Sequence, residues 1–306
     1  MEEIKIFAPA TIANVSCGFD VLGLCLDTVG DEMVIRKANK KGVKITKIVG
    51  QNIPSEALEN VAGVAALAFL EKVDATCGFE IEIYKNIKPG SGIGSSAASA
   101  AGAVFGINKL LGEPFSLEEL IPFAMEGEKL ASGTAHADNV APALLGGFTL
   151  IRSYDPLDVL KIPTPTELYA TVIHPQIEIK TADARSVLRK KVTLQETVVQ
   201  LGNLGGLISG LYTNDYSLIG RSLKDVIVEP SRSILIPEFH KVIATAKFAG
   251  ALGGGISGSG PSIFALSKGK ETAEKVGLAM ANVYKDLEID FDIHVSKINS
   301  NGIKII

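Results

Sequence analysis

A strand, a glycine-rich loop and an alanine-rich helix follow one another in this chain, and this order constrains its fold most. Residues 79–84 alternate apolar and polar side chains, as a half-buried strand does. Residues 97–111 are rich in alanine and predict a tightly packed helix. Glycines let a backbone approach a phosphate, and the first N–H groups of a helix point toward it. The pattern therefore predicts an anion site over the intervening loop: Pro89, Gly90, Ser91, Gly92, Ile93, Gly94, Ser95, Ser96 and Ala97.

The loop differs from two common nucleotide-binding motifs. No Gly-Lys-Ser/Thr sequence follows it, so it is not a Walker A loop. Its glycines fall at every second position, so it is not the dinucleotide G-x-G-x-x-G motif either. The hydroxyls of Ser95 and Ser96 are suited to phosphate or to a magnesium ion. A flexible Gly/Ser turn before a helix is the alternative, and the pattern alone leaves it open.

Composition and charge exclude several classes of protein. With 306 residues, 46% of them hydrophobic and 21% charged, the chain can bury a sizeable core. Its net charge of −4 argues against a nucleic-acid groove, which needs a basic face. Cys17, Cys25 and Cys77 form no Cys-x-x-Cys pair, so a zinc or redox motif is not supported. The N-terminus lacks the basic region of a signal peptide, and residues 61–70 are too few to span a bilayer. We therefore expect a cytoplasmic protein that binds neither nucleic acid nor membrane.

The order of elements predicts an α+β protein with two domains. Short strands, helical spacing over 58–72 and a capping box at Ser116-Leu117-Glu118-Glu119 occupy the first half, and Pro122 is expected to kink the capped helix. Prolines at 156, 163 and 165 mark a boundary, so we expect domains over residues 1–155 and 156–306. The second half predicts strands at 168–173, 262–266 and 291–295 and helices at 194–213, 238–249 and 271–287. This mixed order favours two α+β sandwiches over one doubly wound sheet.

A second glycine-rich segment, Gly253-Gly254-Gly255-Ile256-Ser257-Gly258, does satisfy G-x-G-x-x-G. The dinucleotide motif needs a strand before it and a helix after it, whereas here a helical pattern precedes and an apolar strand follows. We expect a turn that brings its backbone close to a ligand or to the first loop. A purely structural turn between helix and strand remains open.

Polar residues in otherwise apolar surroundings indicate a second binding region. Asp20 follows the first strand among apolar residues and needs a partner if it is buried, which a substrate ammonium would supply. Glu126 and Glu128 point to different faces of one helix, so one of them can face the loop and hold magnesium. Arg185 and Arg232 are each suited to a carboxylate. An Asx turn at Asp20 and solvated arginines are the alternatives.

Three ordered motifs together resemble those of the GHMP small-molecule kinases. They are Pro9-Ala10-Thr11 through Gly18-Phe19-Asp20, the loop 89–98, and Gly254 through Ser257-Gly258-Ser259-Gly260-Pro261. The resemblance implies an N-terminal domain like domain 2 of ribosomal protein S5 and a ferredoxin-like C-terminal domain. It implies ATP over residues 89–97, Asn60 near the adenine, and Mg²⁺ on Ser96 and Glu128. Where mevalonate kinases carry a lysine in the first motif, this chain has Ala10-Thr11, which puts a lysine-assisted mechanism in doubt.

Within that family, Asn14 with Gly18-Phe19-Asp20 and the run His136-Ala137-Asp138-Asn139 resemble the members that act on homoserine. This implies ATP-dependent phosphorylation of the side-chain hydroxyl of L-homoserine. The implied substrate-binding residues are Asn14, Asp20, His136, Arg185 and Arg232. Asn139 would orient the hydroxyl, and either Asp138 or the phosphate itself would take its proton. We also expect a homodimer. The alternatives are another GHMP kinase, acting on mevalonate, diphosphocytidyl-methylerythritol or shikimate, and a non-catalytic amino-acid or nucleotide sensor.

Overall fold

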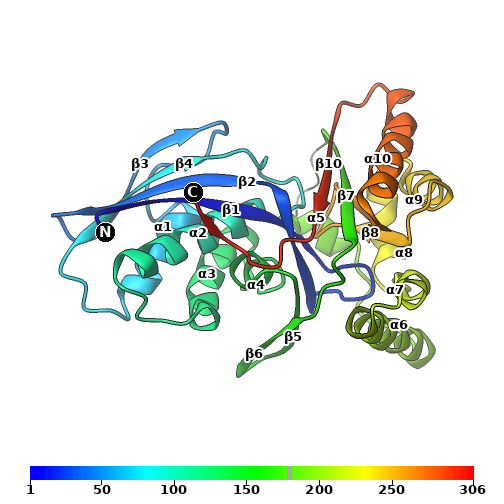
Figure 1. Ribbon diagram of the computed structural model, residues 1–306, viewed down its shortest axis with the longest axis horizontal. Coiled ribbons are helices and arrows are strands. Elements are labelled where there is room, and N and C mark those ends of the chain that lie inside the picture. The colour runs from blue at the N-terminus through cyan, green and yellow to red at the C-terminus, as the bar shows by residue number, and fades with distance from the viewer. Residues whose placement is uncertain (178, 180) are drawn as a thin grey trace.

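Two sheets with helices packed against them make up the molecule (Figure 1). The computed structural model describes residues 1–306 except 178 and 180. One sheet has seven strands, with the order β11-β1-β2-β4-β3 and with β5 and β6 extending from β2. The other has four strands in the order β10-β7-β9-β8. The chain is therefore a mixed α+β protein, as the sequence predicts.

The first sheet is built around the long hairpin of β1 (Glu3–Ala13) and β2 (Leu22–Ala38). Next to β2 lies β4 (Gly78–Tyr84), which pairs in parallel with β3 (Val43–Val49). Four helices gather on one side of this sheet: α1 (Val61–Leu70), α2 (Ser95–Leu110), α3 (Leu117–Ser132) and α4 (Val140–Leu145) (Figure 1). A Cβ on Gly106 of α2 would lie 2.1 Å from the Cδ1 atom of Ile35, so glycine permits the close packing of helix on sheet.

The capping box predicted at Ser116 is present. Ser116 accepts a hydrogen bond from the backbone N–H of Glu119, and the Glu119 carboxylate accepts one from the backbone N–H of Ser116. Pro122 lies inside α3 without ending it, since the helix runs on to Ser132. The capping box fixes where α3 begins and hence where its later turns lie.

The first sheet also takes in residues from beyond the expected boundary. Strand β5 (Phe148–Tyr154) forms a hairpin with β6 (Leu157–Ile162), and the final strand β11 (Lys304–Ile305) pairs with β1. The expected boundary at residues 155 and 156 falls at the turn of this hairpin. The chain passes to the second sheet after Ile162 and returns to the first after β10.

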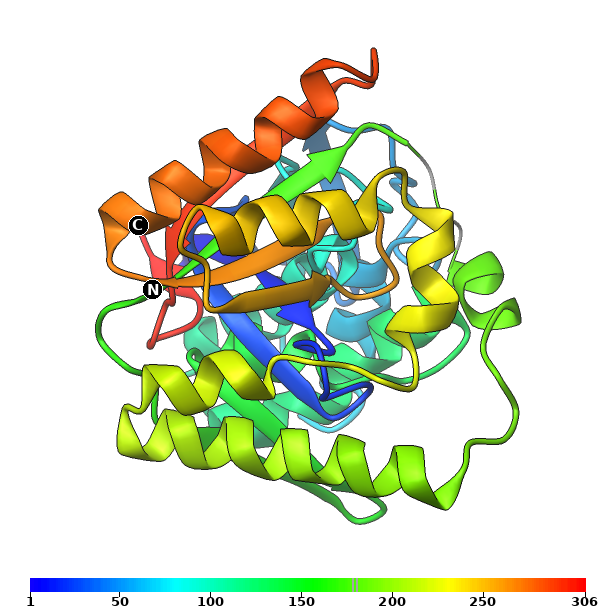
Figure 2. The ribbon, with the colours of Figure 1, turned by 90° about the vertical axis from the view of Figure 1, so that its right-hand side faces the viewer.

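The second sheet is antiparallel and has a ferredoxin-like order. Its strands are β7 (Leu168–Pro175), β8 (Gly253–Ile256), β9 (Ile263–Lys268) and β10 (Phe291–Lys297). Helix α9 (Phe239–Phe248) joins β7 to β8, and α10 (Lys270–Lys285) joins β9 to β10, which gives the order β-α-β-β-α-β. The insertion between β7 and α9 holds α5 (Thr181–Ser186), α6 (Leu194–Thr213), α7 (Tyr216–Ser222), α8 (Glu229–Arg232) and the short η1 (Ser233–Leu235). Helices α6 and α7 lie side by side (Figure 2).

One expected turn is a strand. Gly253, Gly254 and Gly255 belong to β8 and pair with β9. A Cβ on Gly254 would lie 2.1 Å from the carbonyl oxygen of Phe264, so these glycines serve a close approach between backbones. The turn itself comes at residues 257–262. In the part of the chain that the structure describes, no helix is long and apolar enough to cross a membrane.

Candidate active site

A cavity of about 820 Å³ opens between the glycine loop and the second sheet and gathers nearly all the predicted site residues. Its lining includes Asn14, Asp20, Asn60, Pro89, Gly90, Gly92, Gly94, Ser95, Ser96, Glu128, His136, Asp138, Asn139, Arg185 and Arg232. Three predicted loop residues, Ser91, Ile93 and Ala97, are buried behind the lining instead. We call residues 89–96 with Glu128 the phosphate-loop wall, and Asp20, His136, Arg185 and Arg232 the charged wall.

The backbone of the phosphate-loop wall has the conformation that its glycines permit. Gly90, Gly92 and Gly94 have φ angles of 75°, 81° and 69°, in the left-handed region that favours glycine. A Cβ on Gly94 would lie 2.0 Å from the Oγ1 atom of Thr11, and one on Gly92 would lie 2.6 Å from the carbonyl oxygen of Gly260. Only glycine fits at these two positions. The loop then leads directly into the first turn of α2, whose N–H groups suit an anion.

The second glycine-rich segment holds this loop from the other sheet. Ser257 Oγ donates to the carbonyl of Gly92 at 2.7 Å, and Ser262 Oγ donates to the carbonyl of Ser91 at 2.6 Å. The sequence predicted that this segment approaches a ligand or the first loop, and the contact with the loop is confirmed. The loop conformation therefore depends on both halves of the chain.

A buried lysine that the sequence analysis missed supports the loop from below. Lys85 is 3% exposed and pairs with Asp31, and its Nζ also donates to the Ser95 carbonyl and to Ser99 Oγ, the latter at 2.9 Å. Burial lowers the pKa of Lys85, and the charge of Asp31 opposes that shift. Fifty-four positions separate the two partners, and no local pattern links them.

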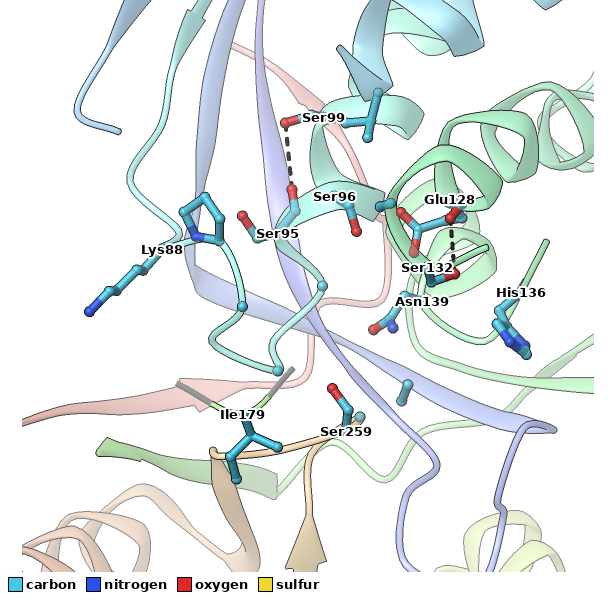
Figure 3. Close-up of a pocket in the computed structure, with 18 of the residues that line it drawn as sticks. Lys88, Ser95, Ser96, Ser99, Glu128, Ser132, His136, Asn139, Ile179 and Ser259 are labelled. Carbon is cyan, nitrogen blue, oxygen red and sulfur yellow. Dashed lines mark hydrogen bonds between the residues drawn. The ribbon is translucent and has the colours of Figure 1, made fainter. Parts of the chain in front are cut away.

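Glu128 is the acidic residue of α3 that faces the loop. Its carboxylate points from α3 toward Ser96 at the start of α2 (Figure 3). Glu128 is 6% exposed, and its Oε1 atom has no hydrogen-bond partner among the described residues. Burial raises the pKa of Glu128 to about 7, while Ser96 and Lys85 oppose the shift. Glu126, by contrast, lies on the outer face of α3 beside Lys129. The prediction that the two glutamates face different ways is confirmed.

The donor set around Glu128 suits a magnesium ion. An unpartnered buried carboxylate oxygen beside a serine hydroxyl needs a cation or a proton. Mg²⁺ commonly takes only one or two carboxylates and completes its shell with water and substrate phosphates. The described residues contain no cluster of three or more His, Cys, Asp or Glu that would form an all-protein cage.

Asn60 has a structural task at the edge of the cavity. It is the N-cap of α1, where its Oδ1 accepts from the backbone N–H of Ala62 at 2.9 Å. Its Nδ2 donates to the carbonyl of Pro54 at 2.7 Å. The side chain therefore shapes the segment from Ile53 to Asn60, and the expected contact with adenine stays a prediction.

In the charged wall, His136 lies between a carboxylate and a guanidinium. Its Nδ1 is 3.9 Å from Asp20 Oδ1, and Arg185 donates to its Nε2. An acceptor Nε2 implies that Nδ1 carries the proton. Burial lowers the pKa of His136, with Asp20 opposing and both arginines adding to the shift. A neutral imidazole thus lies between the Asp20 carboxylate and the Arg185 guanidinium.

Arg232 and Arg185 retain donors for an anion. Arg232 is 4% exposed; its Nε donates to the Ala184 carbonyl at 3.0 Å and its Nη1 to the Gly258 carbonyl at 3.1 Å. These two bonds leave three of its five N–H groups. The Nε of Arg185 is buried and has no partner among the described residues. Burial lowers the pKa of Arg232, so an anionic partner would stabilise its charge.

Three further predicted residues differ in what their side chains do. Asn14 Oδ1 accepts from the Asp20 N–H at 2.9 Å and Asn14 Nδ2 donates to the Gly258 carbonyl at 2.7 Å, so Asn14 orients the loop that carries Asp20. Asn139 Oδ1 accepts from Thr11 Oγ1 at 2.7 Å, which leaves its amide nitrogen as a donor. Burial, followed by the charges of Asp20 and Glu128, raises the pKa of Asp138 to about 7.

Known proteins share both the sequence motifs and the fold of this chain. Residues 60–147 match the family model of the GHMP kinase N-terminal domain, and residues 207–286 match that of the GHMP kinase C-terminal domain. A mevalonate kinase of L. major in complex with R-mevalonate has a TM-score of 0.71 at 17% identity, over 96% of each chain, and shares the fold. The two family-model matches show that the chain is a GHMP kinase.

Relatives of higher identity narrow the class further. A homoserine kinase of Chlorobium phaeobacteroides strain BS1 is 48% identical over 100% of both chains, and one of Methanococcus vannielii is 40% identical over 94% of this chain and 93% of its own. The crystal structure of homoserine kinase from Cytophaga hutchinsonii has a TM-score of 0.96 at 55% identity, covering 100% of this chain and 98% of that one. The chain belongs to the homoserine kinases of the GHMP kinase family.

Proposed function

We propose that the chain transfers the γ-phosphoryl group of ATP to the side-chain hydroxyl of L-homoserine, giving O-phospho-L-homoserine for threonine biosynthesis. One observation carries the proposal: a single cavity joins a glycine loop at a helix N-terminus to a wall with one carboxylate and two arginines. The loop suits phosphates. The charged wall suits an α-amino acid, with Asp20 for the ammonium and Arg185 and Arg232 for the carboxylate.

The reaction asks the protein mainly for positioning and charge neutralisation. Ser96 and Glu128 would hold Mg²⁺, which when bound would neutralise charge on the phosphates. The N–H groups of the loop and of the first turn of α2 would bind the phosphate oxygens. Asn139, fixed by Thr11, would orient the hydroxyl of homoserine. Asp138, with a pKa of about 7, would accept its proton near neutral pH.

An assay of ADP release with a panel of hydroxyl compounds tests the proposal. L-Homoserine should be turned over with ATP and Mg²⁺, while mevalonate, shikimate and diphosphocytidyl-methylerythritol should not, because they lack the α-amino acid group. L-Homoserine amide should be a poor acceptor, because it lacks the carboxylate. Turnover of another compound of the panel in place of homoserine would refute homoserine as the acceptor but would still show that the protein is a kinase. A protein that binds ATP and releases no ADP with any acceptor would be a sensor.

We also propose a homodimer, which the exposed face of α6 supports. Leu194, Val198, Leu201 and Tyr212 are exposed on this helix and recur with Gly205 at spacings of three, four or seven residues, which keeps them on one face. No charged residue occurs from Thr197 to Thr213. A two-fold axis beside Asn203 would pair two antiparallel copies of α6, with Leu201 of each copy against Gly205 of the other. Sedimentation equilibrium should give twice the chain mass, and Leu201→Asp should give the monomer, while Leu278→Asp on the exposed side of α10 should not.

A further inference from the structure

The hydroxyl of Tyr154 joins two distant parts of the charged wall. Tyr154 is the last residue of β5. Its Oη donates to the backbone carbonyl of Asp20 at 2.9 Å and accepts from the backbone N–H of Ala137 at 3.4 Å. Asp20 lies in the loop between β1 and β2, and Ala137 lies between α3 and α4, so one side chain crosses from the hairpin to both segments. Tyr154 does not line the cavity.

The Asp20 backbone is held at both of its polar groups. Its φ angle of 57° is in the left-handed region, which residues with a Cβ adopt at a cost. Asn14 Oδ1 accepts from the Asp20 N–H, and Tyr154 donates to the Asp20 carbonyl. Without the second bond, Asp20 keeps its N–H bond to Asn14 but loses the bond that fixes its carbonyl. The direction of the Asp20 carboxylate, which faces His136, depends on the backbone conformation that these two bonds fix.

The other partner of the hydroxyl lies between two predicted site residues. Ala137 is fully buried, with His136 on one side and Asp138 on the other. Burial, followed by the charge of Asp138, raises the pKa of Tyr154, so the phenol stays protonated and can donate. The hydroxyl thus sets the separation of Asp20 from the segment that carries His136 and Asp138.

We propose that Tyr154 is a positioning residue for recognition of the α-amino acid part of the acceptor. It acts through the Asp20 carboxylate, whose separation from residues 136–138 it sets, without contact with the substrate. The inference rests on the proposed acceptor site. Its consequence is specific, because losing the hydroxyl should loosen the charged wall and leave the phosphate-loop wall intact.

Steady-state kinetics of Tyr154→Phe test this inference. A hydrogen bond is worth about 0.5–1.5 kcal/mol net, so KM for L-homoserine should rise roughly threefold to tenfold. The value of kcat and KM for ATP should stay within twofold. Tyr284→Phe is the matched control, because Tyr284 donates to the Pro237 carbonyl at 2.8 Å in the other half of the molecule. The control should lower thermal stability to a similar extent and leave KM for homoserine unchanged.

A double-mutant cycle with Asp20→Asn separates positioning from general loosening. Tyr154→Phe should raise KM for homoserine by less than twofold in the Asp20→Asn background, because the carboxylate that it positions is gone. An equal effect in both backgrounds, an unchanged KM in the single variant, or equal changes in KM for ATP and for homoserine would overturn the inference. If the wild-type protein uses another acceptor, the proposed function fails, and an unchanged KM of Tyr154→Phe for that acceptor overturns the inference separately.

Discussion

The two walls of the cavity bind by different means and come from differently distributed parts of the chain. The phosphate-loop wall is almost continuous in sequence and offers backbone N–H groups, with one buried carboxylate behind them. The charged wall offers side chains of both signs, drawn from the β1–β2 loop, the α3–α4 segment and the insertion after β7. Backbone donors suit the phosphates that all nucleotides share, whereas side chains can be exchanged to suit one acceptor. The phosphate-loop wall therefore identifies the family, and the charged wall identifies the member.

Removing the Glu128 carboxylate should give the largest effect, because this group would hold the Mg²⁺ that neutralises charge on the phosphates. The change should be confined to the phosphate-loop wall. We expect Glu128→Gln to lower kcat by a hundredfold or more while KM for homoserine changes only a fewfold. The matched control is Glu126→Gln on the outer face of the same helix, which should behave as wild type. Steady-state kinetics at several Mg²⁺ concentrations give kcat and KM for both variants. Near-normal turnover of Glu128→Gln at saturating Mg²⁺ would assign the metal to another group.

The pH dependence of stability should report one buried acid from each side of the cavity, Glu128 and Asp138. The pKa of Glu128 and that of Asp138, the acid beside the charged wall, are raised to about 7 from 4.5 and 3.8. The folded state then binds these protons more tightly than the unfolded state, so stability falls as pH rises from about 4 to 7. Glu128 contributes about 3 kcal/mol and Asp138 about 4 kcal/mol over this window, at about 1.4 kcal/mol per pKa unit.

Thermal melts of the unliganded protein from about pH 4 to pH 7 measure this slope. Glu128→Gln and Asp138→Asn should each flatten it, and Glu126→Gln should leave it unchanged. Glu229, whose pKa burial also raises to about 7, contributes equally in all variants. Slopes that match in the wild type and in both site variants would show that neither acid is held protonated by the fold.

Loss of a guanidinium should affect the charged wall alone. We expect Arg185→Leu to raise KM for homoserine tenfold to a hundredfold, because a charge-assisted hydrogen bond is worth roughly 1.5–3 kcal/mol. KM for ATP should change less than threefold. Arg189→Leu, which removes an exposed arginine paired with Glu196, is the control. Equal increases in both KM values would mean that Arg185 contacts the phosphates instead.

The smallest effect should come from a residue between the walls. Thr11 donates to Asn139 Oδ1 and packs against Gly94 of the loop. Thr11→Val keeps the shape and removes the hydroxyl, so kcat should fall about fivefold, which corresponds to about 1 kcal/mol. Steady-state kinetics measure the change, with Thr149→Val, a fully buried threonine of β5, as the control. An unchanged kcat would show that Asn139 needs no help from Thr11.

Local patterns predicted the phosphate-loop wall because its binding groups are neighbours in sequence. The strand, the loop and the start of α2 follow from residues 79–98 alone, and Ser116 fixes α3 by its cap. In the charged wall, residue chemistry suggested Asp20, Arg185 and Arg232 one at a time. Only the family resemblance joined them into one site, since no local pattern relates Asp20 to Arg232. Long-range pairs such as Lys85 with Asp31, and Tyr154 with Asp20, gave no signal. The glycines at 253–255 suggested a turn, yet they form strand β8. Their role in the close approach to Phe264 of β9 depends on strand pairing, which the local sequence pattern does not show.

The pairing of β11 with β1 has a consequence for the order of synthesis. A ribosome makes β1 long before β11, and the outer edge of β1 has no partner strand until residues 304 and 305 emerge. An open edge can pair with the edge of another nascent chain. Most of the first sheet, by contrast, can form from residues 3–84 at once. Residues 304 and 305 therefore protect a strand that is made long before them, and until they pair with it this edge is open to misassembly.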